Sequence, residues 1–333
     1  MIIDRVKIYV KAGDGGEGDL SSLTLSARRI IGGGGDGGDG GNVIIKVNPH
    51  LYDLNKFLVN KTFTATNGAR GSRNNKKGKR GEDITVNVPE GTLVFDEAGN
   101  FIADVSGETQ ELLVCRGGRA GKGTYKKTYS LPAEAGEEHK LILDYRAPND
   151  VAVLGMPNSG KTSLVNALTR HSFKVADYPF TTTSCAWAKA TYAYKPFTVL
   201  DTPPLNEKTH SKGLNGFLKH LTRSSILLLV SENASRFQEE FAFLKKEIIA
   251  FDEETQSLPH VDEGVQSLPC AGKGMRSLPH GGEGLLKGKK IFYLLSKVDT
   301  IEKGAGAKNC LRVSAATGLG IETLKKKIVN ALT

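Results

Sequence analysis

The chain has 333 residues, of which 39% are hydrophobic, so it is long enough for two domains and can bury sizeable cores. Its formal net charge of +9 favours a polyanionic partner such as RNA, DNA or an acidic membrane, although a basic solvated surface would give the same sum. No apolar run approaches the roughly 20 residues of a membrane-spanning helix, and we expect no stable membrane insertion.

The N-terminal residues 1–11 alternate apolar and charged side chains. This is the pattern of a strand, and it matches neither a signal peptide nor a transit peptide. The cysteines are scattered through the chain and form no metal or redox motif. They are Cys115, Cys185, Cys270 and Cys310. We interpret them as reduced thiols of a protein in a reducing compartment.

The first half of the chain is rich in glycine. Of 39 glycines, 24 precede Pro148, mostly in runs at residues 13–18, 32–41 and 117–123. Strand patterns lie between these runs, at residues 4–10, 42–47, 83–88, 110–115 and 140–145. We therefore predict a β-rich domain over residues 1–148 with extended glycine-rich excursions. A flexible linker is the alternative for residues 32–41, but a strand pattern resumes directly after them.

From Asn149 onward, strand and helix patterns alternate. Strand sequence occurs at residues 151–154, 191–200, 226–230, 291–295 and 310–313. Helical periodicity occurs at residues 161–169, 214–222, 237–251 and 321–332. This alternation predicts an α/β domain over residues 149–333, with a doubly wound, mostly parallel sheet.

Residues 255–286 interrupt this alternation with a repeat. The segments Gln256-Ser-Leu-Pro-His, Gln266-Ser-Leu-Pro-Cys and Arg276-Ser-Leu-Pro-His recur every ten residues. A solenoid is one interpretation, but so few short units rich in proline and glycine bury too little apolar surface. We predict a disordered insertion.

A phosphate-binding loop is predicted between the first strand and helix of the α/β domain. Gly155-Met-Pro-Asn-Ser-Gly-Lys-Thr162 matches the pattern G-x-x-x-x-G-K-[ST] in the required context, against the alternative of a simple glycine turn. Backbone N–H groups and the helix N-terminus would face phosphate oxygens. Lys161 would reach the β- and γ-phosphates, and Thr162 would bind Mg²⁺. The predicted nucleotide-binding residues here are Gly155, Asn158, Ser159, Gly160, Lys161, Thr162 and Ser163.

Two later segments indicate guanine. Ser296-Lys-Val-Asp299 resembles the N-K-x-D motif with serine in place of asparagine. The Asp299 carboxylate could accept hydrogen bonds from the guanine N1–H and amino group, which adenine does not offer, and Lys297 would lie along the base. Ser314-Ala315-Ala316 resembles the loop whose backbone N–H donates to the guanine carbonyl. The order and spacing of these motifs favour GTP and GDP over ATP.

The γ-phosphate would be sensed by two segments. Thr182, in Asp177-Tyr-Pro-Phe-Thr-Thr-Thr, would contact it through Mg²⁺. Asp201, in Asp201-Thr-Pro-Pro204, would hold Mg²⁺ through water, with Pro204 where the D-x-x-G switch has glycine. Proline has no N–H to offer the phosphate. We predict Lys161, Thr182 and Asp201 as catalytic residues and Thr162, Thr182 and Asp201 as Mg²⁺ ligands.

These motifs resemble the Obg family of GTPases. The G-domain match is carried by Gly155-Met-Pro-Asn-Ser-Gly-Lys, Asp177-Tyr-Pro-Phe-Thr-Thr and Phe217-Leu-Lys-His. In the first half, the segment beginning Ile3-Asp-Arg-Val-Lys, Gly37-Gly-Asp-Gly-Gly and Val88-Pro-Glu-Gly-Thr resemble the glycine-rich Obg domain. The resemblance covers about residues 1–250 and 290–333.

The resemblance implies a fold and a role. The fold is a β-rich Obg domain carrying left-handed glycine-rich helices, followed by a Ras-like P-loop G domain. The role is assembly of the large ribosomal subunit, in bacteria or in organelles. We expect a cytoplasmic protein, with the mitochondrial matrix as the alternative that the basic charge suits. Pro204, Ser296 and the insertion depart from the family pattern, and Ser296 is expected to loosen the base pocket.

Two acid-free basic clusters predict RNA binding. Both lie in glycine-rich loops that could follow a phosphate backbone, and tyrosines accompany the second. The predicted RNA-binding residues are Arg70, Arg73, Lys76, Lys77, Lys79, Arg80, Arg116, Arg119 and Lys122. A pair of solvated basic loops is the alternative interpretation.

Together these patterns predict a monomeric, Mg²⁺-dependent GTPase with slow hydrolysis that binds rRNA of the large ribosomal subunit. The alternative is a degenerate G domain that binds GTP or GDP without effective turnover, as Pro204 suggests. A membrane-associated protein is a third interpretation, which the lack of a basic amphipathic helix disfavours.

Overall fold

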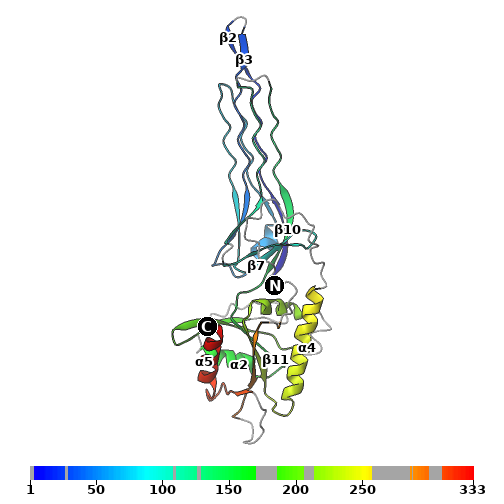
Figure 1. Cartoon of the computed structure of the whole chain (residues 1–333), viewed down its shortest axis with the longest axis vertical. Helices are drawn as coiled ribbons and strands as arrows, with labels where there is room; N and C mark the ends of the chain where they lie inside the picture. Colours follow the sequence, from blue (N-terminus) through cyan, green and yellow to red (C-terminus); the bar gives the residue numbers. More distant parts are fainter. Residues whose placement is uncertain are drawn as a thin grey trace. The chain divides into compact units, whose positions relative to one another are not determined.

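The computed structural model describes residues 4–26, 29–107, 110–125, 129–169, 186–205, 214–256, 286, 288–299 and 310–333 (Figure 1). The described residues up to Tyr145 form one compact unit, and those from Arg146 form a second. Most of the repeat, residues 257–285, lies outside the described residues. None of the helices described has the length and hydropathy needed to span a bilayer.

The N-terminal unit is built on two sheets. The larger has the order β5-β1-β10-β7-β8 and the smaller the order β6-β4-β9. Their strands are β1 (Arg5–Lys11), β4 (Val43–Val47), β5 (Thr62–Thr64), β6 (Ile84–Val88), β7 (Thr92–Phe95), β8 (Phe101–Val105), β9 (Glu111–Cys115) and β10 (Glu138–Tyr145). In β1, Val6, Ile8 and Val10 are buried while Arg5 and Lys7 are exposed, which is the alternation of a half-buried strand. The short helix α1 (Lys56–Val59) contributes the buried Phe57.

The glycine-rich segments are ordered and run side by side between these sheets and the hairpin of β2 (Ser22–Ser26) and β3 (Arg29–Gly32) (Figure 1). Backbone hydrogen bonds join them. Gly16 N–H donates to Gly38 at 2.8 Å, and Gly38 N–H donates to Ala69 at 2.9 Å. The flexible-linker interpretation of residues 32–41 is therefore wrong.

The close approach of these segments explains the glycines. A Cβ atom on Gly38 would lie 2.0 Å from the backbone oxygen of Lys79, and one on Gly13 would lie 1.9 Å from that of Thr66. Both distances are far inside van der Waals contact, and the obstructing atoms are backbone. A side chain at either position would force the segments apart.

Aspartates between the glycines complete this packing. The carboxylates of Asp14, Asp36 and Asp39 accept hydrogen bonds of 2.9 Å from the backbone N–H groups of Gly136, Gly123 and Ala120 respectively. These bonds satisfy donors that have no strand partner. The repeated Asp-Gly-Gly motif thus supplies both the close approach and the side-chain acceptors.

The C-terminal unit contains a six-stranded sheet of order β12-β13-β11-β14-β15-β16. Its strands are β11 (Val151–Gly155), β12 (Ala186–Tyr192), β13 (Lys195–Asp201), β14 (Ile226–Ser231), β15 (Lys290–Leu295) and β16 (Leu311–Arg312). All neighbouring pairs are parallel except β12 with β13.

Helices cover both faces of this sheet. One core contains Val151 and Val153 of β11 with residues of α2 (Lys161–Thr169) and α5 (Ile321–Leu332). The other contains Ala152 and Leu154 with residues of η1 (Leu214–Arg223) and α4 (Phe237–Gln256). Successive residues of β11 therefore enter opposite cores, which explains its unbroken apolar sequence. The predicted doubly wound arrangement is confirmed.

Candidate functional site

The phosphate-binding motif occupies the turn between β11 and α2. Asn158 and Gly160 have φ of 63° and 80°, the left-handed region that a sharp turn requires. The Lys161 ammonium donates to the carbonyl oxygens of Gly155 and Met156 at 3.1 and 2.9 Å. It is thus folded over the loop in which phosphate oxygens would lie. Burial lowers its pKa, an effect that the Asp201 carboxylate opposes.

The predicted Mg²⁺ ligands meet at the start of α2. The Thr162 hydroxyl donates to Asp201 Oδ2 at 2.7 Å. Asp201 Oδ1 is buried, and no described residue hydrogen-bonds to it. Burial raises the pKa of Asp201, against the opposing effects of Thr162 and Lys161. A cation would satisfy the orphaned oxygen, and the hard oxygen donors suit Mg²⁺, so these residues fit the ion.

The described residues contain no group of three His, Cys, Asp or Glu side chains that could hold a metal by themselves. This agrees with the expected type of site, because Mg²⁺ usually takes one or two protein oxygens together with phosphate and water. Thr182, the remaining predicted ligand and catalytic residue, lies outside the described residues, as do residues 177–183 around it.

The segment after β13 lies against the phosphate-binding loop. The Thr202 hydroxyl donates to the Val153 oxygen at 2.6 Å, and Leu205 N–H donates to the Gly155 oxygen at 3.3 Å. Pro204 is exposed and has no N–H. The first backbone donor after the two prolines is therefore already bonded within the protein.

The guanine motifs also converge on this edge of the sheet. The Ser296 hydroxyl lies 2.7 Å from the Ser159 oxygen and 3.2 Å from the Ser231 oxygen, and it can donate its one hydrogen to either. Ser159 belongs to the phosphate-binding loop. Ser296 therefore links that loop to the end of β15. Whether serine loosens the base pocket, as we expect, stays a prediction.

Asp299 and Ser314 lie close together. A hydrogen bond from the Ser314 side chain lowers the pKa of Asp299, so the carboxylate form is favoured. Asp299 is exposed, and Ser314 is buried at the start of the loop that follows β16. Ala315 is half-buried and Ala316 exposed. The two predicted base-recognition segments thus form one surface, with Asp299 open to a ligand.

Glu232, which no sequence motif indicated, also lies at this edge. It follows β14, and its carboxylate forms an ion pair with the Lys297 ammonium. A signal was present, since Glu232 is an acid directly after a buried apolar strand, where parallel sheets place ligand-binding residues.

The predicted RNA-binding residues lie in the N-terminal unit, where every basic residue of the first cluster, from Arg70 to Arg80, is exposed. Asn74 and Asn75 have φ of 59° and 58°, so Arg73 and Lys76 flank a tight turn of the primed type. Acids accompany part of the set: Lys79 pairs with Glu82, Arg80 with Asp83, Arg119 with Glu134 and Lys122 with Asp36. Arg73, Lys76 and Lys77 form no ion pair with any acid that the structure describes, whereas Arg70 interacts electrostatically with Asp19.

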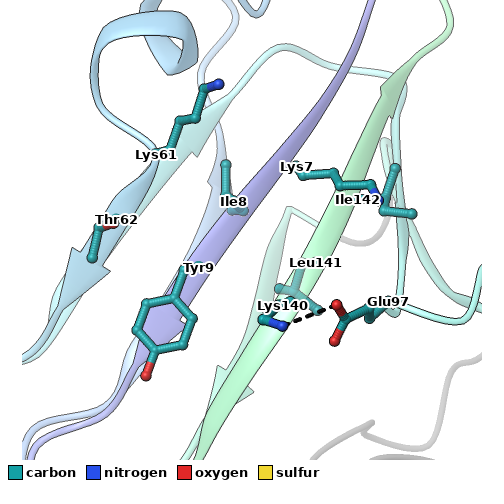
Figure 2. A pocket seen from close by; sticks show the side chains of 9 residues that line it. All are labelled: Lys7, Ile8, Tyr9, Lys61, Thr62, Glu97, Lys140, Leu141 and Ile142. Atoms are coloured by element: carbon teal, nitrogen blue, oxygen red, sulfur yellow. Dashed lines mark hydrogen bonds and ion pairs between the residues drawn. The ribbon is translucent and has the colours of Figure 1, made fainter.

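A hollow of about 180 Å³ also lies in the N-terminal unit, on β5, β1 and β10 (Figure 2). Lys7, Lys61 and Lys140 contribute to its lining, and Lys140 pairs with Glu97 at 3.0 Å. It contains none of the predicted nucleotide-binding residues. The lining carries a small surplus of positive charge, as the basic loops do.

Two family models match this chain, each over a different part. The GTP1/OBG family model matches residues 3–144, and the model described as 50S ribosome-binding GTPase matches residues 150–261. A GTPase Obg of Thermoanaerobacter sp. (strain X514) is 38% identical over 278 residues, which is 78% of this chain and 66% of that protein. This chain thus spans slightly less than two thirds of that relative.

Other relatives match over more of their length. The GTPase Obg of Chloroherpeton thalassium is 32% identical over 98% of this chain and 95% of that protein. That of Thermodesulfovibrio yellowstonii is 36% identical over 77% and 81%. With an Obg domain followed by a P-loop G domain, and relatives of this similarity, the chain belongs to the Obg family of GTPases.

Proposed function

We propose that the protein binds GTP and GDP with Mg²⁺, hydrolyses GTP slowly, and acts in assembly of the large ribosomal subunit through rRNA. The observation that carries the nucleotide part is the meeting of three features at one sheet edge. They are the phosphate-binding loop, the Thr162–Asp201 oxygen pair and the Asp299–Ser314 pair. Each matches a different part of a guanine nucleotide.

In this proposal the nucleotide displaces contacts that the protein now makes with itself. Lys161 exchanges the Gly155 and Met156 oxygens for β- and γ-phosphate oxygens. Thr162 and Asp201 hold the Mg²⁺, which neutralises phosphate charge when bound. Asp299 accepts hydrogen bonds from the guanine N1–H and amino group as a carboxylate, the form that its lowered pKa favours.

Slow hydrolysis follows from the segment after Asp201. Because neither proline offers an N–H and the Leu205 N–H is bonded to Gly155, the γ-phosphate lacks one donor that a glycine at position 204 would supply. The same observation supports a second candidate, a G domain that binds GTP and GDP without effective turnover.

Single-turnover assays separate these two functions. Purified protein loaded with GTP should convert it to GDP only with Mg²⁺, at a rate at or below the roughly 10⁻⁴ s⁻¹ of an unassisted Ras-type GTPase. Chromatography of the released nucleotide gives the rate, and EDTA and ATP are the controls. GTP that stays intact over several days would favour the binding-only function, and failure to retain GTP would contradict both.

The rRNA part rests on charge in the N-terminal unit. Arg70, Arg73, Lys76 and Lys77 are exposed and can contact phosphate oxygens, and Arg73 and Lys76 flank a fixed turn. The GTP-bound and GDP-bound states would differ around Thr182 and Asp201 and so alter the ribosome interaction. Cytoplasmic location stays a prediction.

A further inference from the structure

Two neighbouring strands of the C-terminal sheet, β14 and β15, end beside each other. An acidic residue, Glu232, follows the first, and a basic residue, Lys297, follows the second. β14 and β15 pair in parallel, with Ser231 opposite Leu295. Directly after them, the Glu232 carboxylate forms an ion pair with the Lys297 ammonium. This ion pair joins the predicted guanine motif, residues 296–299, to the end of β14. No sequence motif had indicated that the end of β14 takes part in nucleotide binding.

The backbone at Lys297 is held in an unfavourable conformation. Its φ of 52° lies in the left-handed region, which lysine rarely adopts. The residue before it is fixed by two groups, because Ser296 N–H donates to the Ser231 oxygen at 2.8 Å and its hydroxyl lies 2.7 Å from the Ser159 oxygen. Such backbone conformations persist where surrounding contacts impose them, and they gather at ligand sites.

The ion pair itself is a poor stabiliser of the fold. The side chains of Lys297 and Glu232 are 45% and 39% exposed, and ion pairs this exposed contribute little to folding because water screens them. A role in holding the lysine is a better account. With the ammonium of Lys297 held by Glu232, its four-carbon stem can lie along an apolar base surface.

We propose that Glu232 is a positioning residue for guanine-nucleotide binding, which acts by holding Lys297 in the orientation that covers the base. The inference rests on the proposed nucleotide site. It adds a residue that contacts Lys297 and does not contact the nucleotide itself. Without the Glu232 carboxylate, the Lys297 ammonium would be less ordered before the nucleotide binds. Ordering it on binding would cost conformational entropy and so weaken nucleotide affinity.

A double-mutant cycle on the full chain tests this role. GDP affinity is measured by fluorescent-nucleotide titration for the unmutated protein, Glu232→Gln, Lys297→Met and the double variant. Glu232→Gln should weaken GDP binding by about threefold to fivefold, the scale of a partly exposed ion pair. On the Lys297→Met background the same substitution should change affinity by less than about 1.5-fold, because the group it acts through is gone.

Thermal unfolding and a control variant complete the design. Glu232→Gln should leave the nucleotide-free Tm unchanged and reduce the rise in Tm on adding GDP. Glu111→Gln, which removes the carboxylate of a similarly exposed ion pair with Lys46 in the N-terminal unit, should change neither. An equal loss on both backgrounds, or no loss on either, would overturn the proposal. Absence of GDP binding by the unmutated protein would instead refute the proposed function.

Discussion

At the scale of single residues, the segment from Asp201 to Leu205 carries our expectation of slow turnover. Asp201 is a predicted Mg²⁺ ligand, and its buried Oδ1 accepts no hydrogen bond from a described residue. Pro204 removes a donor, and the next one, Leu205 N–H, is bonded to Gly155. Nucleotide binding and turnover should therefore respond separately to substitution here, since GDP makes no contact at a γ-phosphate position.

Replacement of Pro204 by glycine should restore turnover. Glycine supplies an N–H and the freedom to reorient when the phosphate leaves, and one donor to developing charge is worth roughly 10²–10³ in rate. Pro204→Gly should hydrolyse GTP about 100-fold faster and bind non-hydrolysable GTP analogues more tightly, with GDP affinity nearly unchanged. Pro203→Gly is the neighbouring control. If the unmutated protein turns over as fast as Pro204→Gly, the proline is a neutral replacement.

At the scale of elements, the N-terminal unit depends on backbone contacts between glycine-rich segments that have no strand or helix of their own. Carbonyl oxygens of one segment lie too close to the glycines of the next to leave room for a Cβ atom. Aspartate carboxylates accept hydrogen bonds from backbone N–H groups that have no strand partner. Such a structure tolerates almost no added volume, although an ordinary loop would accept an alanine easily.

The prediction for Gly38→Ala follows directly. The new Cβ would lie 2.0 Å from the Lys79 oxygen, so at least one segment must move and break hydrogen bonds. We expect a loss of about 2–5 kcal/mol in the stability of the N-terminal unit. Gly99→Ala is the control, because nothing lies within 4 Å and only its φ of 94° opposes a side chain, at a cost of about 1 kcal/mol. Equal unfolding midpoints for the two variants would contradict this account.

At the scale of the whole molecule, the two units divide the chemistry, with the predicted RNA-binding residues before Tyr145 and the nucleotide motifs after it. Neutralising Arg70, Arg73, Lys76 and Lys77 should weaken binding to large ribosomal subunits. It should also reduce the slope of log affinity against log salt by about one per lost phosphate contact. Nucleotide affinity should not change. The charge-matched control neutralises four exposed lysines of the C-terminal unit, Lys189, Lys246, Lys326 and Lys327. If both variants lose the same ribosome affinity, the effect is one of net charge and the prediction is contradicted.

The sequence predicted the G domain well because its signals are local. The phosphate-binding pattern lies between a buried strand and α2, whose bounds were predicted as observed. The hairpin of β12 and β13 was less visible, because its turn uses Ala193 and Tyr194 at φ of 49° and 62° where glycine or asparagine is usual. The Glu232–Lys297 ion pair could not be predicted for a different reason. Its two residues are 65 apart in sequence, and only the pairing of β14 with β15 brings them together.

Prediction for the N-terminal unit was coarser. The main strands were found, but β2, β3, β5, β7 and β8 were missed, as they are short and lie among glycines. Contacts such as Asp36 with Gly123 join distant loops, and no local pattern reports them. Cys185, Cys270 and residues 257–285 of the repeat lie outside the described residues, so what we expect of them stays a prediction.

The central claim, that this edge of the sheet recognises guanine through Asp299, is tested most directly by nucleotide affinity. Equilibrium titration with GDP, IDP and ADP should show GDP bound most tightly, IDP weaker because it lacks the amino group, and ADP far weaker. Asp299→Asn should weaken GDP binding about 10- to 100-fold, as expected for loss of charge-assisted hydrogen bonds, and should narrow the gap between the nucleotides. Equal affinity of the unmutated protein for GDP and ADP would contradict the claim.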